Sequence, residues 1–74
     1  MNIVDQLEQL AHQEPFQPFT IRVAGGGKHR INHPEYLGFS PRKKTVLVWT
    51  ETDVAIFINP TLISEVEEHA RNRK

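Results

Sequence analysis

The stretch that decides the fold runs from Pro15 to His33 and reads PFQPFTIRVAGGGKHRINH. Apolar and polar residues alternate from Phe19 to Val23, and alternation resumes from Lys28 to His33. Alternation with a period of two is typical of a strand that buries one face. Consecutive glycines separate the two runs, and glycine readily supplies the positive φ angles of a tight turn. The stretch therefore predicts a β-hairpin.

The length of the loop in this first hairpin can be predicted from which residues share a face of the sheet. Residues that lie opposite each other on antiparallel strands share one face of the sheet. A loop with an even number of residues would place apolar residues opposite charged ones. A loop over Gly25–Gly27 pairs Ile21 with Ile31 instead, and we predict that register. It also sets Arg22 opposite Arg30, which is mildly destabilising unless an anion lies between them.

A second hairpin is predicted from Thr45–Thr50 and Val54–Ile58, joined by a loop over Glu51–Asp53. Both of its faces are then apolar, which is typical of strands covered on both sides. One face belongs to the core, and the other needs cover from the N-terminal helix, from a curved sheet or from another subunit. The predicted cross-strand pairs are Val46 with Ile58, Val48 with Ile56, Leu47 with Phe57, and Trp49 with Ala55. We predict an interaction surface made of Leu47, Trp49 and Phe57.

Shorter segments complete the chain. Apolar residues recur at helical spacing over residues 3–11, Asn2 can cap this helix, and the helix should end near Gln13 before a proline. After the corner at Pro34, residues 37–39 should continue the sheet with Leu37 and Phe39 inward and Gly38 at a bulge or a close approach. The closing segment should bury Leu62, Ile63 and Val66, with an edge strand over residues 63–67.

These elements predict an α+β fold that is mostly β. We expect an N-terminal helix followed by a small antiparallel five-stranded open barrel or curved meander sheet of the SH3-like or Sm-like kind. Phe19, Ile21, Ile31, Val48 and Ile56 should meet inside. A single domain is predicted over residues 1–67, with a flexible basic tail over residues 68–74.

Composition narrows the class of protein. A chain of 74 residues without cysteine has room for one small core and no disulfide to support it. Oligomerisation is therefore expected, and we predict a homo-oligomer. No apolar run is long enough for a membrane span and no signal peptide is recognisable, so a cytoplasmic protein without a membrane partner is expected.

The chain resembles members of a small bacterial family, a domain of unknown function. The motifs that carry this resemblance are Pro15-Phe16-Gln17-Pro18-Phe19-Thr20-Ile21, Gly25-Gly26-Gly27, His33-Pro34-Glu35, Val46-Leu47-Val48 and Ile63-Ser64-Glu65-Val66. The family implies no known activity. A second resemblance, in the order of elements only, is to Sm-like RNA-binding ring proteins. The chain lacks their glycine in the second strand and their Asp-containing motif that contacts a base.

Basic residues are concentrated in the middle of a chain whose net charge is zero. The outer face of the first hairpin and a nearby loop attract phosphates in principle, and an exposed aromatic ring stacks bases. The alternative to self-association is therefore an RNA- or DNA-binding module. Its predicted residues are Arg22, Lys28, Arg30, Arg42, Lys43, Lys44 and Tyr36, with Trp49 as a second stacking candidate.

Catalysis and metal binding are weakly signalled. His29 and His33 stand about 13 Å apart on a strand, too far to hold one ion without a partner such as His12 or Glu35. Ser40 precedes a proline in a turn, and Ser64 has no base nearby in the sequence. We therefore expect no enzyme, no catalytic residue, no cofactor and no metal site, and we identify no small-molecule substrate. A small metal-binding regulator is the third and least favoured function.

Overall fold

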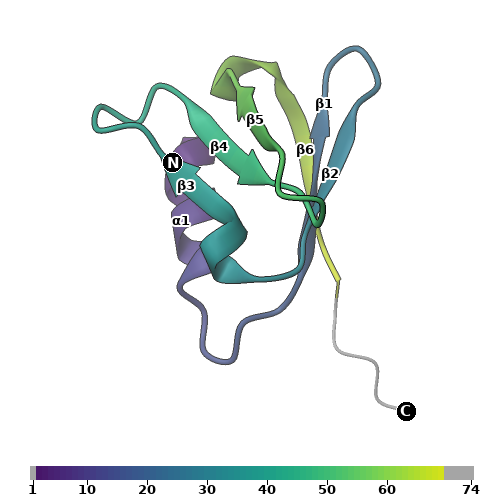
Figure 1. Cartoon of the computed structure of the whole chain (residues 1–74). Coiled ribbons are helices and arrows are strands. Elements are labelled where there is room, and N and C mark those ends of the chain that lie inside the picture. Colours follow the sequence, from purple (N-terminus) through teal and green to yellow (C-terminus); the bar gives the residue numbers. More distant parts are fainter. Residues whose placement is uncertain (1, 70–74) are drawn as a thin grey trace.

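The computed structural model describes residues 2–69. The elements, in chain order, are α1 (Ile3–Ala11), β1 (Phe19–Val23), β2 (Lys28–Ile31), η1 (Pro34–Tyr36), β3 (Leu37–Phe39), β4 (Val46–Trp49), β5 (Ala55–Ile58), η2 (Pro60–Leu62) and β6 (Ile63–Glu68). The strands form two antiparallel sheets of three strands each, in the orders β2-β1-β6 and β3-β4-β5 (Figure 1). The α+β, mostly β class is confirmed. A five-stranded barrel is not confirmed, because the strands form two separate three-stranded sheets and the 3-10 turn η1 lies between β2 and β3 along the chain.

The first hairpin forms, but its predicted register is wrong. Phe19 lies opposite Ile31 and Arg22 lies opposite Lys28, so Ile21 does not face Ile31. The Val23 N–H donates to the Gly27 carbonyl at 2.8 Å, which places Gly27 in the ladder and makes residues 24–26 the loop. Of the three glycines, Gly25 and Gly26 have positive φ angles, 97° and 109°, and Gly27 does not. The turn thus needs two of the three glycines, and the odd loop length and the two faces of each strand are as expected.

The second hairpin has the predicted register, with Val46 opposite Ile58, Val48 opposite Ile56, Leu47 opposite Phe57 and Trp49 opposite Ala55. The N–H of Thr50 donates to the Val54 carbonyl at 3.0 Å, and this bond closes the loop over residues 51–53. Asp53 takes the positive φ of 68° that this turn requires. On the other side of β4, Gly38 lies opposite Leu47 in a regular register, and a Cβ added to Gly38 would meet Leu47 at 3.8 Å, an ordinary contact. The prediction of a bulge or close approach at Gly38 is therefore wrong.

Helix α1 begins at its predicted cap, since the Asn2 Oδ1 accepts the N–H of Asp5 at 2.9 Å. It ends at Ala11, before the predicted Gln13, with His12 as the C-terminal cap. Leu7 is fully buried and belongs to one core cluster with residues of both sheets. The helix therefore closes the core that the two sheets share.

The core holds four of the five residues predicted to meet inside: Phe19, Ile21, Ile31 and Val48 are buried, while Ile56 is half-buried. The prediction for Leu62 is wrong, because its side chain is 48% exposed. Its segment forms η2 and is held instead by its backbone, since the Leu62 carbonyl accepts the N–H of Ala24 at 2.7 Å.

Strand β6 pairs with β1 and places Glu68 opposite Phe19. The next residue, His69, donates its N–H to the Pro18 carbonyl at 3.1 Å. The ladder thus includes two residues that the sequence assigns to a tail. The remainder of that predicted tail, residues 70–74, lies outside the described residues.

Candidate functional site

The most exposed apolar side chains of the second sheet lie together on its outer face. We call this surface the apolar outer face and define it by Leu47, Trp49, Ala55 and Phe57. Leu47 lies opposite Phe57, and Trp49 lies opposite Ala55. Phe57 is 71% exposed and Trp49 is 36% exposed, whereas Leu47 is half-buried. All three residues of the predicted interaction surface are therefore neighbours on one face.

The opposite face of the same strands is the core face. Val46 and Val48 alternate with Leu47 and Trp49 along β4, and both valines are buried. Leu7 of α1 belongs to the same buried cluster as the two valines. The helix packs on the core face. It therefore does not cover the apolar outer face, which was one of the three possibilities considered from the sequence.

The first sheet carries a polar outer face that cations of β1 and β2 share with carboxylates of β6. Arg22, in the central strand β1, has Lys28 of β2 on one side and Glu65 of β6 on the other. Its Nε donates to the Glu67 Oε2 at 2.9 Å and lies 3.8 Å from the Glu65 Oε1. The hydrogen bond from Arg22 holds the pKa of the Glu67 carboxyl below its usual value. Arg22 is thus neutralised within its own sheet.

Lys28 and Arg30, both on the edge strand β2, remain exposed. With Asn32, Trp49 and Glu51 they line a small pocket of about 240 Å³ between β2 and the second hairpin. The Arg30 Nε donates to the Asn32 Oδ1 at 2.7 Å, and the Asn32 Nδ2 donates to the Glu51 Oε2 at 3.0 Å. Here the structure brings two predicted cations next to a predicted stacking ring.

Tyr36, the other predicted stacking residue, is bound at the far end of this chain of hydrogen bonds. Its hydroxyl donates to the Glu51 Oε1 at 3.4 Å, and the ring lies edge-on to His33 with centroids 5.0 Å apart. The negative charge of Glu51 raises the pKa of the Tyr36 hydroxyl above its usual value. Tyr36 is half-buried, so Trp49 offers the more exposed ring.

The cations of the β3–β4 loop, Arg42, Lys43 and Lys44, do not join that pocket. The Lys43 Nζ lies 2.7 Å from the Glu8 Oε2 of α1, and this pairing raises the pKa of the Lys43 ammonium. Lys43 and Lys44 line a separate cavity of about 440 Å³ with the start of α1 and residues 59–61. The predicted single basic surface is therefore divided into two.

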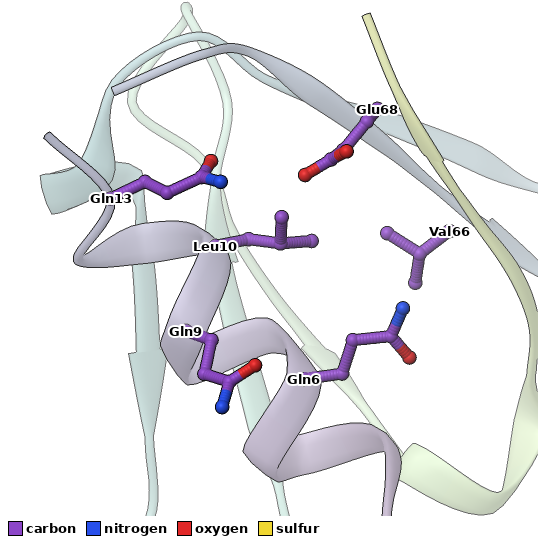
Figure 2. A pocket seen from close by; sticks show the side chains of 6 residues that line it. All are labelled: Gln6, Gln9, Leu10, Gln13, Val66 and Glu68. Atoms are coloured by element: carbon purple, nitrogen blue, oxygen red, sulfur yellow. The ribbon is translucent and has the colours of Figure 1, made fainter. Parts of the chain in front are cut away.

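A larger groove separates α1 from β6. It has a volume of about 570 Å³. Figure 2 shows Leu10 and Gln6 of the helix reaching toward Val66 and Glu68 of the strand. The groove is also lined by Gln9 and Gln13. Its walls are amides, aliphatic carbons and one carboxylate, and this set offers hydrogen bonds but neither a nucleophile nor a general base.

The remaining candidates for chemistry are held in structural roles. The Ser40 Oγ accepts the N–H groups of Lys44 and Thr45 at 3.0 and 3.1 Å, and the Ser64 Oγ donates to the Arg22 carbonyl at 3.2 Å. Among residues 2–69, no three His, Asp or Glu side chains come close enough to hold a metal ion. No helix in that part of the chain is long and apolar enough to cross a membrane.

The carboxylates of β6 are the site residues that sequence reasoning missed. Glu65 and Glu67 share one face by their spacing of two, and that face is the one that carries Arg22. The signal was present as the alternation of Ile63-Ser64-Glu65-Val66-Glu67. The sequence did not indicate that this strand pairs with β1. The Arg22–Glu67 bond joins residues that are 45 positions apart in the sequence.

Comparison with known proteins does not extend this description: no family model, no curated protein and no solved structure matches the chain.

Proposed function

We propose that this protein is a non-enzymatic interaction module that associates with copies of itself through the apolar outer face. The observation that carries the proposal is the exposure of Phe57, 71% of its surface, next to Trp49 and Leu47. An aromatic side chain contributes a large apolar area when it is buried, and contiguous exposed apolar surface commonly marks an interaction site. A domain this small also gains most from burial that its own core cannot supply.

An open barrel is the finer description of the fold that we propose, and it is compatible with self-association. Strands β2 and β3 follow each other directly around the corner at η1, so together they can be regarded as one bent strand. The order β6-β1-β2 then continues as β3-β4-β5, which supports an open barrel of the SH3-like or Sm-like kind. In such an arrangement β5 and β6 are the free edges.

Analytical ultracentrifugation over a wide concentration range tests the proposal. We expect reversible association of the wild-type protein, and we expect Phe57→Ser to shift the sedimenting species toward monomer. Leu62→Ser is the matched control, because Leu62 is 48% exposed but lies outside the apolar outer face. A wild-type protein that stays monomeric at millimolar concentration would refute the proposal.

A second candidate function, binding of single-stranded nucleic acid, is favoured by the pocket that joins Lys28 and Arg30 to Trp49. Cations that contact phosphates and a ring that stacks a base are the usual components of such sites. Trp49 is the single tryptophan of the chain, so its fluorescence reports directly on this pocket.

The test is a fluorescence titration with a single-stranded oligonucleotide at low and high salt. Binding should quench Trp49, weaken steeply with salt and be reduced by Lys28→Glu. Arg42→Glu is the control, because that exposed cation lies on the separate β3–β4 loop. The absence of quenching at low salt would exclude this function.

A further inference from the structure

Which backbone groups of β5 face outward follows from the hydrogen bond that closes the second hairpin. Thr50 and Val54 are joined by that bond, and bonded pairs alternate with unbonded pairs along an antiparallel ladder. Ile56 and Ile58 therefore direct their N–H and C=O groups toward β4. Ala55 and Phe57 direct theirs away from it, and β5 has β4 as its one partner strand in the two sheets of residues 2–69.

Natural proteins protect the free edges of sheets with charges, short strands or a covering element. The β2 edge follows this rule, because its outward backbone groups belong to Lys28 and Arg30, by the register set at the Val23–Gly27 bond. The β3 edge is only Leu37–Phe39. These two edges therefore need no partner.

The β6 edge is protected twice. The bond from the His69 N–H to the Pro18 carbonyl shows which residue pairs of the β1–β6 ladder are hydrogen-bonded. Val66 and Glu68 belong to unbonded pairs, so they direct their backbone groups away from β1. The strand carries Glu65, Glu67 and Glu68, and α1 lies beside it with Gln6 and Leu10 facing the same groove (Figure 2).

Strand β5 lacks the charged residues that protect the β2 and β6 edges. It reads Ala55-Ile56-Phe57-Ile58, without a charge or a proline. Its outward backbone groups stand at Ala55 and at Phe57, the most exposed large apolar side chain of the described residues. An uncharged edge of this kind is a template for pairing with another strand.

We infer that β5 pairs edge to edge, antiparallel, with β5 of a second copy of this chain. This inference rests on the proposed self-association and specifies how it occurs. With Ile56 at the centre, Ala55 of each copy lies opposite Phe57 of the partner subunit, and the outward N–H and C=O groups of both copies are satisfied. Both phenylalanines fall on the same face, which extends the apolar outer face across the two copies. Asp53 then lies opposite Asn59 of the partner subunit, so no like charges oppose each other.

A second copy fits better than another chain because the pairing is self-complementary. A twofold antiparallel pair of this edge closes on itself, which is the commonest symmetry of homo-oligomers. Pairing of β5 with β6 of a neighbour would instead bring the strand against the carboxylate of Glu68 and the amides that line the groove beside it. Four-residue strands form a smaller interface than the about 1,600 Å² of a standard complex, so the association should be weak and dependent on concentration.

Amide hydrogen exchange measured by NMR at micromolar and millimolar concentrations of the wild-type protein tests the inference. We expect the exchange of the Ala55 and Phe57 amides to slow by about tenfold or more on association. The Ile56 and Ile58 amides, bonded to β4 in both states, are internal controls. Ala55→Pro should abolish the association, because it removes an outward donor and leaves the β4 ladder intact.

The outcomes separate this inference from the proposal on which it rests. Association that leaves the Ala55 and Phe57 amides unprotected would overturn the edge pairing and leave self-association through the apolar outer face standing. Protection that appears at Val66 and Glu68 would overturn the β5–β5 pairing in favour of β5 with β6. An Ala55→Pro variant that folds and associates like the wild type would also overturn the edge pairing. If that variant does not fold, the amide hydrogen exchange of the wild-type protein decides between the outcomes. A protein that remains monomeric would overturn both.

Discussion

At the scale of the residue, Arg22 was predicted to bind phosphate because of its neighbours in the sequence, but in the structure its guanidinium is already paired. It belongs to a basic hairpin, yet its guanidinium is bonded to Glu67 and lies near Glu65. A phosphate would have to displace those carboxylates to reach it. The same bond lowers the pKa of Glu67, and this links the folded state to pH.

The pH dependence has a definite sign. A carboxyl whose pKa is depressed by folding binds its proton more readily in the unfolded state, so it contributes stability above the ordinary value of 4.5 and loses it as pH falls through the folded pKa. We expect Glu67→Gln to be less stable than the wild type near neutral pH. The difference should shrink and vanish as the pH falls below 4.5. Thermal melts between pH 7 and pH 2, followed by circular dichroism, measure it.

Glu14→Gln is the control for this measurement, because Glu14 is exposed in the connector between α1 and β1. It should leave the pH profile of the melting temperature close to that of the wild type. A constant difference between Glu67→Gln and the wild type across the acid range would contradict the linkage to Arg22.

At the scale of the element, the three glycines of the first hairpin have different tasks. Gly26 has a φ of 109° in the loop, whereas Gly27 lies in the ladder opposite Val23. A Cβ on Gly27 would meet its neighbours at 3.8 and 4.0 Å, which are ordinary contacts. The two positions therefore form a matched pair for substitution by alanine.

We expect Gly26→Ala to destabilise the protein by about 1–3 kcal/mol, because alanine is strained at that φ. Gly27→Ala should change the free energy of unfolding by less than about 0.5 kcal/mol. Urea denaturation of the two variants measures both values. Equal losses at the two positions would contradict the loop over residues 24–26 and favour the register with all three glycines in the turn.

The two hairpins show what local sequence can specify. In the second, the polar turn over Glu51–Asp53 fixes the loop, and the register of all four pairs follows from the position of that loop. In the first, three identical glycines leave the position of the loop open by one residue. The register there is supported by a partner that the local pattern does not contain, the bond between Ala24 and Leu62.

The candidate site was predictable to the same extent. The apolar outer face follows from alternation within one hairpin, and three of its four residues, Leu47, Trp49 and Phe57, were predicted to lie together. The charges were not predictable as a surface, because their partners come from elsewhere in the chain: Glu67 for Arg22, Glu8 for Lys43, and Glu51 for the group around Arg30. Residue type predicts a cation, but only the topology of the sheets shows whether it is already paired.

At the scale of the whole molecule, two small sheets and one helix share a single core. Leu7 is fully buried in a cluster that contains Phe19 of the first sheet and Val46 of the second. The helix therefore couples the two sheets, and both should unfold together.

Leu7→Ala tests this coupling. The substitution leaves a cavity and should cost about 2–5 kcal/mol, a large part of the about 5–15 kcal/mol that holds a typical domain folded. Urea transitions followed by Trp49 fluorescence, which reports on the second sheet, and by far-ultraviolet circular dichroism should shift together to a lower midpoint. Gln9→Ala, an exposed position on the same helix, is the control and should leave both transitions near the wild type. If the Trp49 transition kept its wild-type midpoint while the circular dichroism shifted, the second sheet would be stable without the helix, and the shared core would not be what unites the molecule.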